Sequence, residues 1–394
     1  VRLKDGRLES DLTEGGEWVM SHGDNVDALS PTSVQFKLQG TRGCTGSVRP
    51  VVVGNRVLFV DTTRTSIREL GFTFESDGFD AADLTVLAPH LFRGFTIRDA
   101  AYQQTPDSIL WVVRNDGALL SLTYIREQEV WAWAQHDLGG SDAARAQLGF
   151  GDEYPLGYAL RVASIPGSTY LVVARWSAEP SPSFSVWIER LTTAPAADPH
   201  VYAVGLDAGI EYSGVATTTP FDHAAGLQLT EYFLDPSPYM DDRFKVVADG
   251  AILTFTAGTP VAGEYTSSAS SPYITLGEAA GDVTMGINYD STFKSLPLVH
   301  ADQRGAPSYG DRNTVTKVTL RVHESRGAQV GPDEDNLIDI PWQEYGESPI
   351  LPKSKDFTVA LPNCRTTQPR IVVKQSEPSP FTLLSFTAEV ELGR

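Results

Sequence analysis

Two glutamates and two tryptophans lie close together in residues 122–136, which read LTYIREQEVWAWAQH. A glycoside hydrolase needs two carboxyl groups about 5 to 9.5 Å apart, and Glu127 and Glu129 would share a face if they lie on a strand. Their ordinary interpretation is a solvated strand edge that discourages aggregation. Trp131 and Trp133 would also share a face, as a platform for a sugar or, in the interpretation that we favour, as core or interface packing.

Other catalytic and metal-binding motifs are absent from the sequence. There is no glycine-rich dinucleotide loop, no phosphate loop ending in Gly-Lys-Ser/Thr, no pair of histidines around a glutamate and no nucleophile elbow. The seven histidines are scattered without zinc-site spacing. Residues 333–335 (Asp-Glu-Asp) begin like a calcium loop but lack its turn glycine and later glutamate. We therefore predict no catalytic, cofactor or metal site, and we expect that the chain is not an enzyme.

The net charge of the chain argues against tight binding to nucleic acid. The 31 basic and 50 acidic residues give a net charge of −19, so the chain is a poor candidate for gripping DNA by its phosphates. Like-charge repulsion would instead let DNA pass without sticking, although simple solubility explains the acidity equally well. Arg64, Arg68, Arg93 and Arg98 are interspersed with acidic residues, which favours surface ion pairs over weak contacts to DNA in a channel.

Cysteine content and the chain start bear on the cellular compartment. Cys44 and Cys364 lie too far apart in sequence to indicate a disulfide framework or a metal site. We expect two buried thiols in a protein assembled in a reducing cytoplasm.

No stretch approaches the roughly 18 apolar residues of a membrane span, and no leader opens the chain. Because the chain starts at Val1, inside what resembles a blade, we expect an N-terminal portion to be missing.

Almost the whole chain has the pattern of short β-strands. Runs of β-branched and aromatic residues alternate with clusters of Gly, Pro, Asp and Ser. Helical periodicity is nearly absent, and the best helix candidate is 81–90. Residues 115–117 (Asn-Asp-Gly) and 249–250 (Asp-Gly) are predicted hairpin turns, because such turns need residues that tolerate positive φ.

A degenerate repeat indicates propeller blades. Its first strands are predicted at 57–60, 109–113 and 170–173, and its second strands at 67–70, 118–124 and 185–191. From Leu58 to Leu110 to Leu171 the spacing is 52 and then 61 residues, near the roughly 40–50 residues of a propeller blade. One blade must stack on neighbours to bury both faces. The predicted fold is therefore all-β, with an incomplete or irregular β-propeller-like platform of three or four blades.

Composition divides the chain into three parts. Residues 1–203 are expected to form the propeller-like blades. Residues 204–298, rich in Thr, Ser, Gly and Ala, are expected to form a small β-barrel or sandwich. Residues 299–394 are expected to supply C-terminal strands that complete the platform, beginning with a half-buried strand at 315–323. One continuous sheet system is the alternative, because no linker-like run separates the parts.

A series of short segments runs in a characteristic order along nearly the whole chain. They are 15–20, 30–35, 51–60, 74–79, 83–88, 101–106, 122–136, 283–298, 331–335 and 378–391. In this order they resemble one family, the tail nozzle proteins of short-tailed bacteriophages, also called tail tubular protein B or packaged-DNA stabilisation proteins. The region 203–282 matches that family only loosely.

The resemblance implies a structural protein of the virion tail, assembled in the host bacterial cytoplasm. It implies a homo-oligomeric ring, commonly of six subunits, closed by head-to-tail contacts. Such a ring lies below the portal-adaptor ring and near tail fibre or tail needle proteins. Double-stranded DNA passes through its lumen without sequence-specific contacts, so the nozzle retains the genome and then releases it. The alternatives are a tail-associated glycan depolymerase and a glycan-binding host-recognition module without catalysis.

Overall fold

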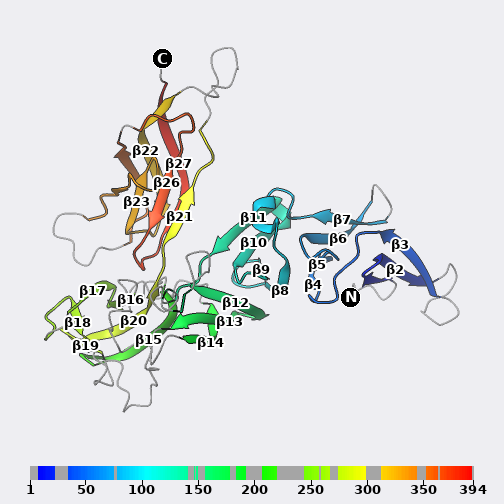
Figure 1. The fold of residues 1–394 in the computed structure, drawn as a ribbon, viewed down its shortest axis with the longest axis horizontal. Helices are drawn as coiled ribbons and strands as arrows, with labels where there is room; N and C mark the ends of the chain where they lie inside the picture. The colour runs from blue at the N-terminus through cyan, green and yellow to red at the C-terminus, as the bar shows by residue number, and fades with distance from the viewer. Residues whose placement is uncertain are drawn as a thin grey trace. The chain divides into compact units, whose positions relative to one another are not determined.

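The computed structural model describes residues 8–22, 34–74, 78–140, 146, 148–149, 156–177, 183–191, 206–219, 244–256, 259–266, 274–298, 312–343, 352–362 and 364–392. The chain forms two compact units (Figure 1). Unit 1 comprises Val1–Gly140, Ala144–Ser177 and Pro182–Thr193, and unit 2 comprises Ser141–Ala143, Ala178–Ser181 and Ala194–Arg394. The predicted boundaries at 203/204 and 298/299 stay predictions.

Unit 1 contains four antiparallel sheets, each built from strands that follow one another in sequence. The first sheet is β1 (Leu8–Thr13), β2 (Gly16–His22) and β3 (Val34–Gly40). The second is β4 (Val51–Val53), β5 (Arg56–Val60), β6 (Ile67–Thr73) and β7 (Gly78–Asp83). The third is β8 (Ile97–Gln103), β9 (Ile109–Arg114), β10 (Leu119–Ile125) and β11 (Val130–His136). The fourth is β12 (Gly157–Ile165), β13 (Ser168–Ser177) and β14 (Ser183–Leu191).

The predicted repeat corresponds to equivalent strands of three sheets. Its first strands are β5, β9 and β13, and its second strands are β6, β10 and β14, so each repeat is the second and third strand of a sheet. Leu58, Leu110 and Leu171, which mark the spacing, are all buried. The prediction of an all-β chain with blade-like sheets is therefore confirmed.

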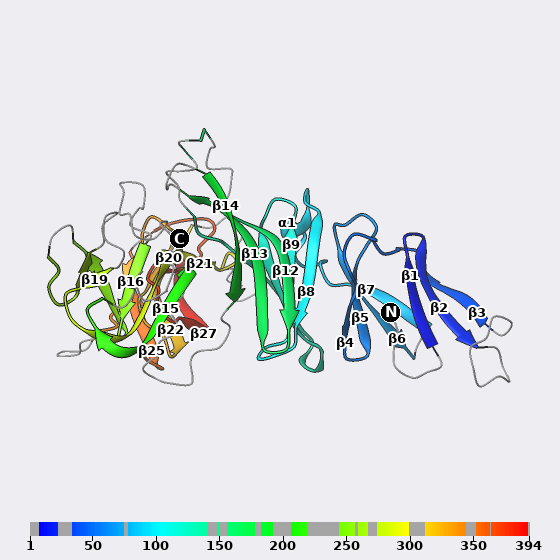
Figure 2. The same ribbon diagram turned by 90° about the horizontal axis from the view of Figure 1, so that it is seen from below.

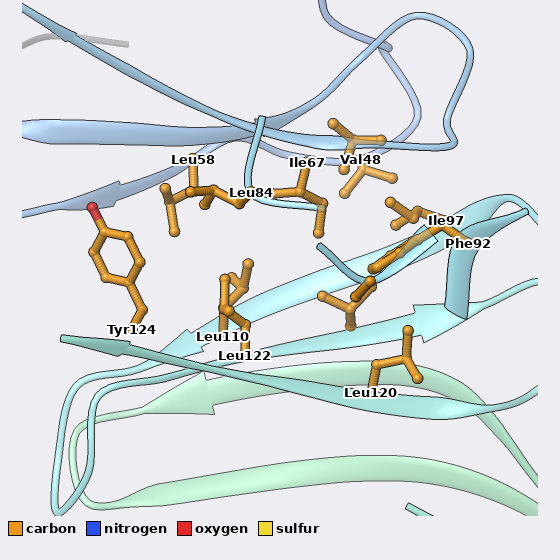
Figure 3. Close-up of a cluster of buried hydrophobic side chains, with 13 residues drawn as sticks. Val48, Leu58, Ile67, Leu84, Phe92, Ile97, Leu110, Leu120, Leu122 and Tyr124 are labelled. Carbon is orange, nitrogen blue, oxygen red and sulfur yellow. The ribbon is translucent and has the colours of Figure 1, made fainter. Parts of the chain in front are cut away.

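The sheets of unit 1 stack face to face in series (Figure 2). One apolar cluster joins Leu12 of the first sheet to Phe59 and Leu70 of the second. A larger cluster fills the space between the second and third sheets, where side chains from both sides interdigitate (Figure 3). A further cluster joins Val113 of the third sheet to Val173 of the fourth. Each internal sheet is thus buried on both faces, as stacked blades require.

One local prediction is confirmed and one is wrong. Gly117 has φ +85° in the turn between β9 and β10, and Gly250 has φ +80° between β16 (Phe244–Ala248) and β17 (Ala251–Phe255), so both Asp-Gly turns form as predicted. The helix predicted at 81–90 is wrong, because β7 runs to Asp83 and pairs Ala81 with Leu70. Only α1 (Pro89–Phe92) is helical there, and its proline begins the helix.

Unit 2 contains a six-stranded sheet in the order β15 (Leu206–Thr217), β20 (Ala280–Asn288), β16, β17, β18 (Glu264–Thr266) and β19 (Thr275–Leu276). All its pairings are antiparallel except β17 with β18, which is parallel. The sheet packs around its own apolar cluster, with Val246, Ile274 and Met285 at 0% exposure.

A β-sandwich forms the rest of unit 2. One of its sheets is β21 (Ser291–Lys294), β26 (Val372–Gln375), β23 (Ala328–Gly331) and β24 (Ile338–Asp339). The other is β25 (Asp356–Ala360), β22 (Asn313–His323) and β27 (Thr382–Leu392). The half-buried strand predicted at 315–323 is confirmed as β22, whose Val318, Leu320 and Val322 enter the sandwich core.

Candidate functional site

Glu127 and Glu129 lie in a turn, and the prediction that they share a face of a strand is wrong. A single 3-10 turn, η1 (Arg126–Gln128), links β10 to β11, and Glu129 follows it with φ 54°. The chain must reverse here because Ile125 pairs directly with Val130. Both glutamates are exposed, so the structure does not bring them together as a pair across a cleft.

Trp131 and Trp133 do lie on one face of β11, opposite Tyr124 and Leu122 of β10. The Trp133 ring packs edge-on against Phe92 with 4.8 Å between ring centroids, and its indole N–H donates to the Leu84 carbonyl at 2.8 Å. This confirms the packing interpretation for Trp133. Trp131 is 41% exposed and forms the rim of the same face.

Next to that rim lies a group that we call the Glu69 cluster: Glu69, Arg56, Tyr124 and Arg126. The Glu69 carboxylate is 3% exposed and accepts a hydrogen bond from the guanidinium of Arg126, which belongs to the turn after β10 in the third sheet. The same carboxylate lies 3.5 Å from Arg56 Nε. A Cβ atom at Gly71 would lie 1.4 Å from Arg56 Nη1, so glycine makes room for the arginine over the strand. The cluster therefore ties the second and third sheets together at the end of their apolar contact.

The Tyr124 side chain crosses from the third sheet toward the second (Figure 3). Burial first, and then the negative charge of Glu69, raises the pKa of its phenol to about 12. The phenol is thus protonated at neutral pH and stands beside a carboxylate already paired with arginine. Such a set offers fixed hydrogen-bond and charge contacts at the edge of the contact between the two sheets, with Trp131 as an adjoining aromatic surface.

Sequence reasoning missed the Glu69 cluster, although one signal could have found it. On a strand, Glu69 shares a face with Ile67, and Ile67 is a core residue at 1% exposure. A carboxylate on a core face needs a cationic partner. The partner Arg126 lies 57 positions away in sequence, so no local motif contains both.

The acidic turn at 333–335 is closed by its own hydrogen bonds. Asp333 Oδ1 accepts the backbone N–H of Asp335 at 3.0 Å and the side-chain amide of Asn336 at 2.7 Å, while Glu334 pairs with Lys294. Among the residues that the structure describes, no cluster of His, Cys, Asp and Glu could hold a metal ion. The turn has the geometry of a self-capped loop.

Only part of the expected arginine pairing is found. Arg68 lies 3.4 Å from Asp83 and donates to the Ala81 carbonyl, so it forms an ion pair as expected, but its side chain is only 11% exposed. Within the described ranges, Arg64, Arg93 and Arg98 form no ion pair with an acidic side chain. No described helix has the length and apolar character needed to cross a membrane.

A concave region with a cavity volume of about 440 Å³ lies where the loop 44–50 meets Leu12 and Glu14. Burial first, and then the charges of Glu17 and Asp61, raises the pKa of the Cys44 thiol to about 11. A protonated, buried thiol is unreactive. Cys44 is buried as expected, whereas Cys364 is partly exposed, and both are free thiols.

His136, whose side chain is partly buried, is the titratable group of β11. Its Nε2 lies 2.7 Å from Ser121 Oγ, and its ring packs 5.2 Å from Trp111. Burial lowers the pKa of His136, and the nearby Asp137 offsets this only in part. The folded chain therefore holds this imidazole neutral.

We expect the free energy of unfolding to fall as the pH drops from 7 to 5.5. The unfolded chain takes up a proton at His136 below about pH 6.5, whereas the folded chain resists it, so acid favours the unfolded state. Urea titrations at several pH values measure this slope. His136→Gln should flatten it and the exposed His323→Gln should not; equal slopes in all three proteins would show that other groups cause it.

Comparisons with known proteins give no family assignment. No protein-family model and no curated protein matches the chain. Among solved structures, an exo-β-1,3-galactanase from Phanerochaete chrysosporium is 10% identical, with a TM-score of 0.22, and the alignment covers 97% of this chain and 81% of that one. A sucrose-6-phosphate hydrolase from Lactobacillus gasseri is 10% identical, with a TM-score of 0.21 and coverage of 98% and 90%.

These similarities correct the expectation that the chain is not an enzyme. We based that expectation on missing motifs, but the solved structures that align over nearly the whole chain include glycoside hydrolases. A carboxylate pair that cleaves a glycoside is defined by its separation in space, so a search for local motifs does not exclude one. At 10% identity and a TM-score of 0.22, the similarity assigns no fold, no activity and no residue role to this chain.

Proposed function

We propose that the chain is a structural component of a phage tail, a nozzle ring that forms the distal DNA channel. The observation that carries this proposal is the ordered series of family-like segments, because these segments supply the framework strands. Residues 15–20 supply most of β2, 51–60 supply β4 and β5, 122–136 supply most of β10 and all of β11, and 378–391 supply most of β27. The resemblance thus involves the residues that build both units.

The physical character of the chain supports a conduit. Sheets stacked in series with continuous apolar contacts form a stiff body, since close-packed interiors resist deformation. A net charge of −19 repels the DNA backbone, so a lumen lined by such subunits would let DNA slide without being held at fixed phosphates. In this proposal the ring joins the portal-adaptor ring to the tail fibre or needle proteins, and retains the genome until ejection.

Electron cryomicroscopy of particles that contain this chain tests the proposal. We expect its density in a ring around the tail axis, commonly six-fold, with acidic side chains facing the lumen. A peripheral position, or a trimer with an open cleft that holds two neighbouring carboxyl groups, would contradict the nozzle and favour a protein that acts on glycans.

A tail-associated glycan-binding or glycan-degrading protein is the second candidate. The observation that favours it is the rim beside the Glu69 cluster, where the half-exposed Trp131 adjoins Tyr124 and Arg126. A flat aromatic ring next to fixed hydrogen-bond donors is a common surface for sugars.

If this candidate holds, Trp131→Ala should weaken binding to host surface polysaccharide at least tenfold, because the stacking surface is lost. Titration by calorimetry measures the affinity, and release of reducing ends measures cleavage. Phe74→Ala is the matched control, since Phe74 is an aromatic side chain that is 91% exposed elsewhere on unit 1. Equal affinities for the native chain and both variants would exclude the Trp131 rim as the glycan site.

A further inference from the structure

β11 is an edge strand of the third sheet, and its outer edge is open. The strand pairs with β10 on one side, and among the described residues no other backbone segment hydrogen-bonds to it. Trp131 is 41% exposed, and Ala132, Ala134 and Gln135 are exposed as well. An edge of this kind presents unpaired N–H and C=O groups to solvent.

The pairing of the sheet shows which backbone groups of β11 point outward. The Tyr124 N–H donates to the carbonyl of Ser108, on the β9 side of β10. The residues of β10 on either side of Tyr124 therefore direct their backbone groups toward β11. The register between β10 and β11 has no shift, so the even-numbered residues of β11 bond to β10. Trp131, Trp133 and Gln135 direct their N–H and C=O groups away from the sheet.

β11 lacks the features that keep other edges from pairing. Proteins protect long edge strands with charged side chains, prolines or bulges. Every other described edge strand of more than three residues contains Lys, Arg, Asp or Glu, whereas β11 contains none of these. β11 also has no proline, and its pairing with β10 has no bulge. Among the described edges it is therefore the one best suited to accept a further strand.

Three exposed carboxylates stand at the two ends of this uncharged edge. Glu127 and Glu129 precede β11, and Asp137 follows it. Antiparallel pairing with β11 of a second copy would bring the glutamates of one copy beside the aspartate of the other, and parallel pairing would bring glutamate beside glutamate. Like charges opposite each other on paired strands are destabilising. The flanking charges thus disfavour a second copy and favour a strand with basic residues at its ends.

We propose that β11 is the docking edge for an extended segment of a partner protein, with an uncharged centre and Lys or Arg at both ends. The segment would extend the four-stranded third sheet by one strand, through main-chain hydrogen bonds to the outward groups of β11. Side chains on one face of the added strand would lie beside Trp131, which favours β-branched or aromatic residues there. Its basic ends would face Glu127, Glu129 and Asp137.

A blocked peptide tests this edge on the native full chain. The probe has seven alternating valines and threonines, the length of β11, between terminal lysines. Amide hydrogen exchange should slow at Trp131, Trp133 and Gln135 when the peptide binds, because their N–H groups gain partners. A peptide with N-methylated backbone amides should not bind. A peptide with glutamates in place of the lysines should bind about tenfold more weakly.

Charge reversal on the chain gives a matched comparison. Glu127→Lys/Glu129→Lys should weaken binding of the lysine-ended peptide about tenfold and strengthen binding of the glutamate-ended peptide. Glu324→Lys/Asp335→Lys changes the net charge equally at exposed positions of unit 2 and should bind as the native chain does. Gln135→Pro removes an outward N–H and should abolish binding, while the fold persists because proline is tolerated where that N–H faces solvent.

Several results would overturn the docking edge. Unchanged exchange in β11 at about 1 mM peptide would do so, as would protection confined to residues outside 130–136. Equal affinities for the lysine-ended and glutamate-ended peptides would remove the role of the flanking carboxylates. Protection of β11 that rises with the concentration of the native chain alone would mean that a second copy occupies the edge. None of these results depends on whether the chain forms a nozzle ring.

Discussion

Replacing Glu69 by alanine is expected to lower the free energy of unfolding of unit 1 by about 3 kcal/mol. The carboxylate is 3% exposed and is the partner of both Arg56 and Arg126. Its removal leaves Arg56, 16% exposed in its side chain, as a cation without its counter-charge between two sheets. Urea unfolding followed by tryptophan fluorescence measures the loss.

An exposed ion pair provides the control for this effect. Arg321 and Asp356 form two hydrogen bonds of 2.8 Å on the sandwich surface, where solvent screens the charges. Arg321→Ala should therefore lower the free energy of unfolding much less than Glu69→Ala does. Similar losses for Glu69→Ala and Arg321→Ala would mean that the Glu69 cluster does not join the sheets, and that apolar packing alone holds them together.

Leu122→Ala is expected to cost about 3 kcal/mol, through lost burial and the cavity that remains. Leu122 is 0% exposed at the centre of the contact between the second and third sheets and pairs with both Leu110 and Trp133. Strands on both sides fix its neighbours, so the site cannot collapse freely. Guanidinium unfolding measures the change, and Trp133 fluorescence reports on the same cluster.

Leu87→Ala removes the same atoms from a loop where Leu87 is 87% exposed. Its cost should stay within about 0.5 kcal/mol. A small loss for Leu122→Ala would show that the second and third sheets do not share one core, which would contradict the serial stack of sheets in unit 1.

The sequence predicted the parts of the fold that depend on local signals. The turn at Asp116-Gly117 needs positive φ, and the alternating pattern of 315–323 needs one buried face, so both were readable within a few residues. The repeat was readable because β5–β6, β9–β10 and β13–β14 occupy equivalent places in their sheets. The helix at 81–90 was wrong because pairing with β6 outweighs the weak helical preference of two alanines.

The candidate site could not be predicted because its members come from different sheets. Glu69 and Tyr124 meet only when the second and third sheets stack, and stacking leaves no signal in residue spacing. The sequence did point to Glu127 and Glu129 as a pair, but we assumed that they lie on a strand. The chain instead reverses direction there, in the turn between β10 and β11. Charged residues on apolar faces were the informative signal.

The order of the strands in the sequence determines which sheets can form first while the chain is being synthesised. Each sheet of unit 1 is complete as soon as its last strand leaves the ribosome, because its pairings are all between consecutive strands. Short loops of this kind close quickly, so the stack can grow one sheet at a time from the N-terminal side. The sandwich of unit 2 cannot do so, because β22 pairs with β27, the last of the described strands. A ribosome that stalls before β27 emerges would therefore carry a finished unit 1 and a sandwich whose apolar core is still open.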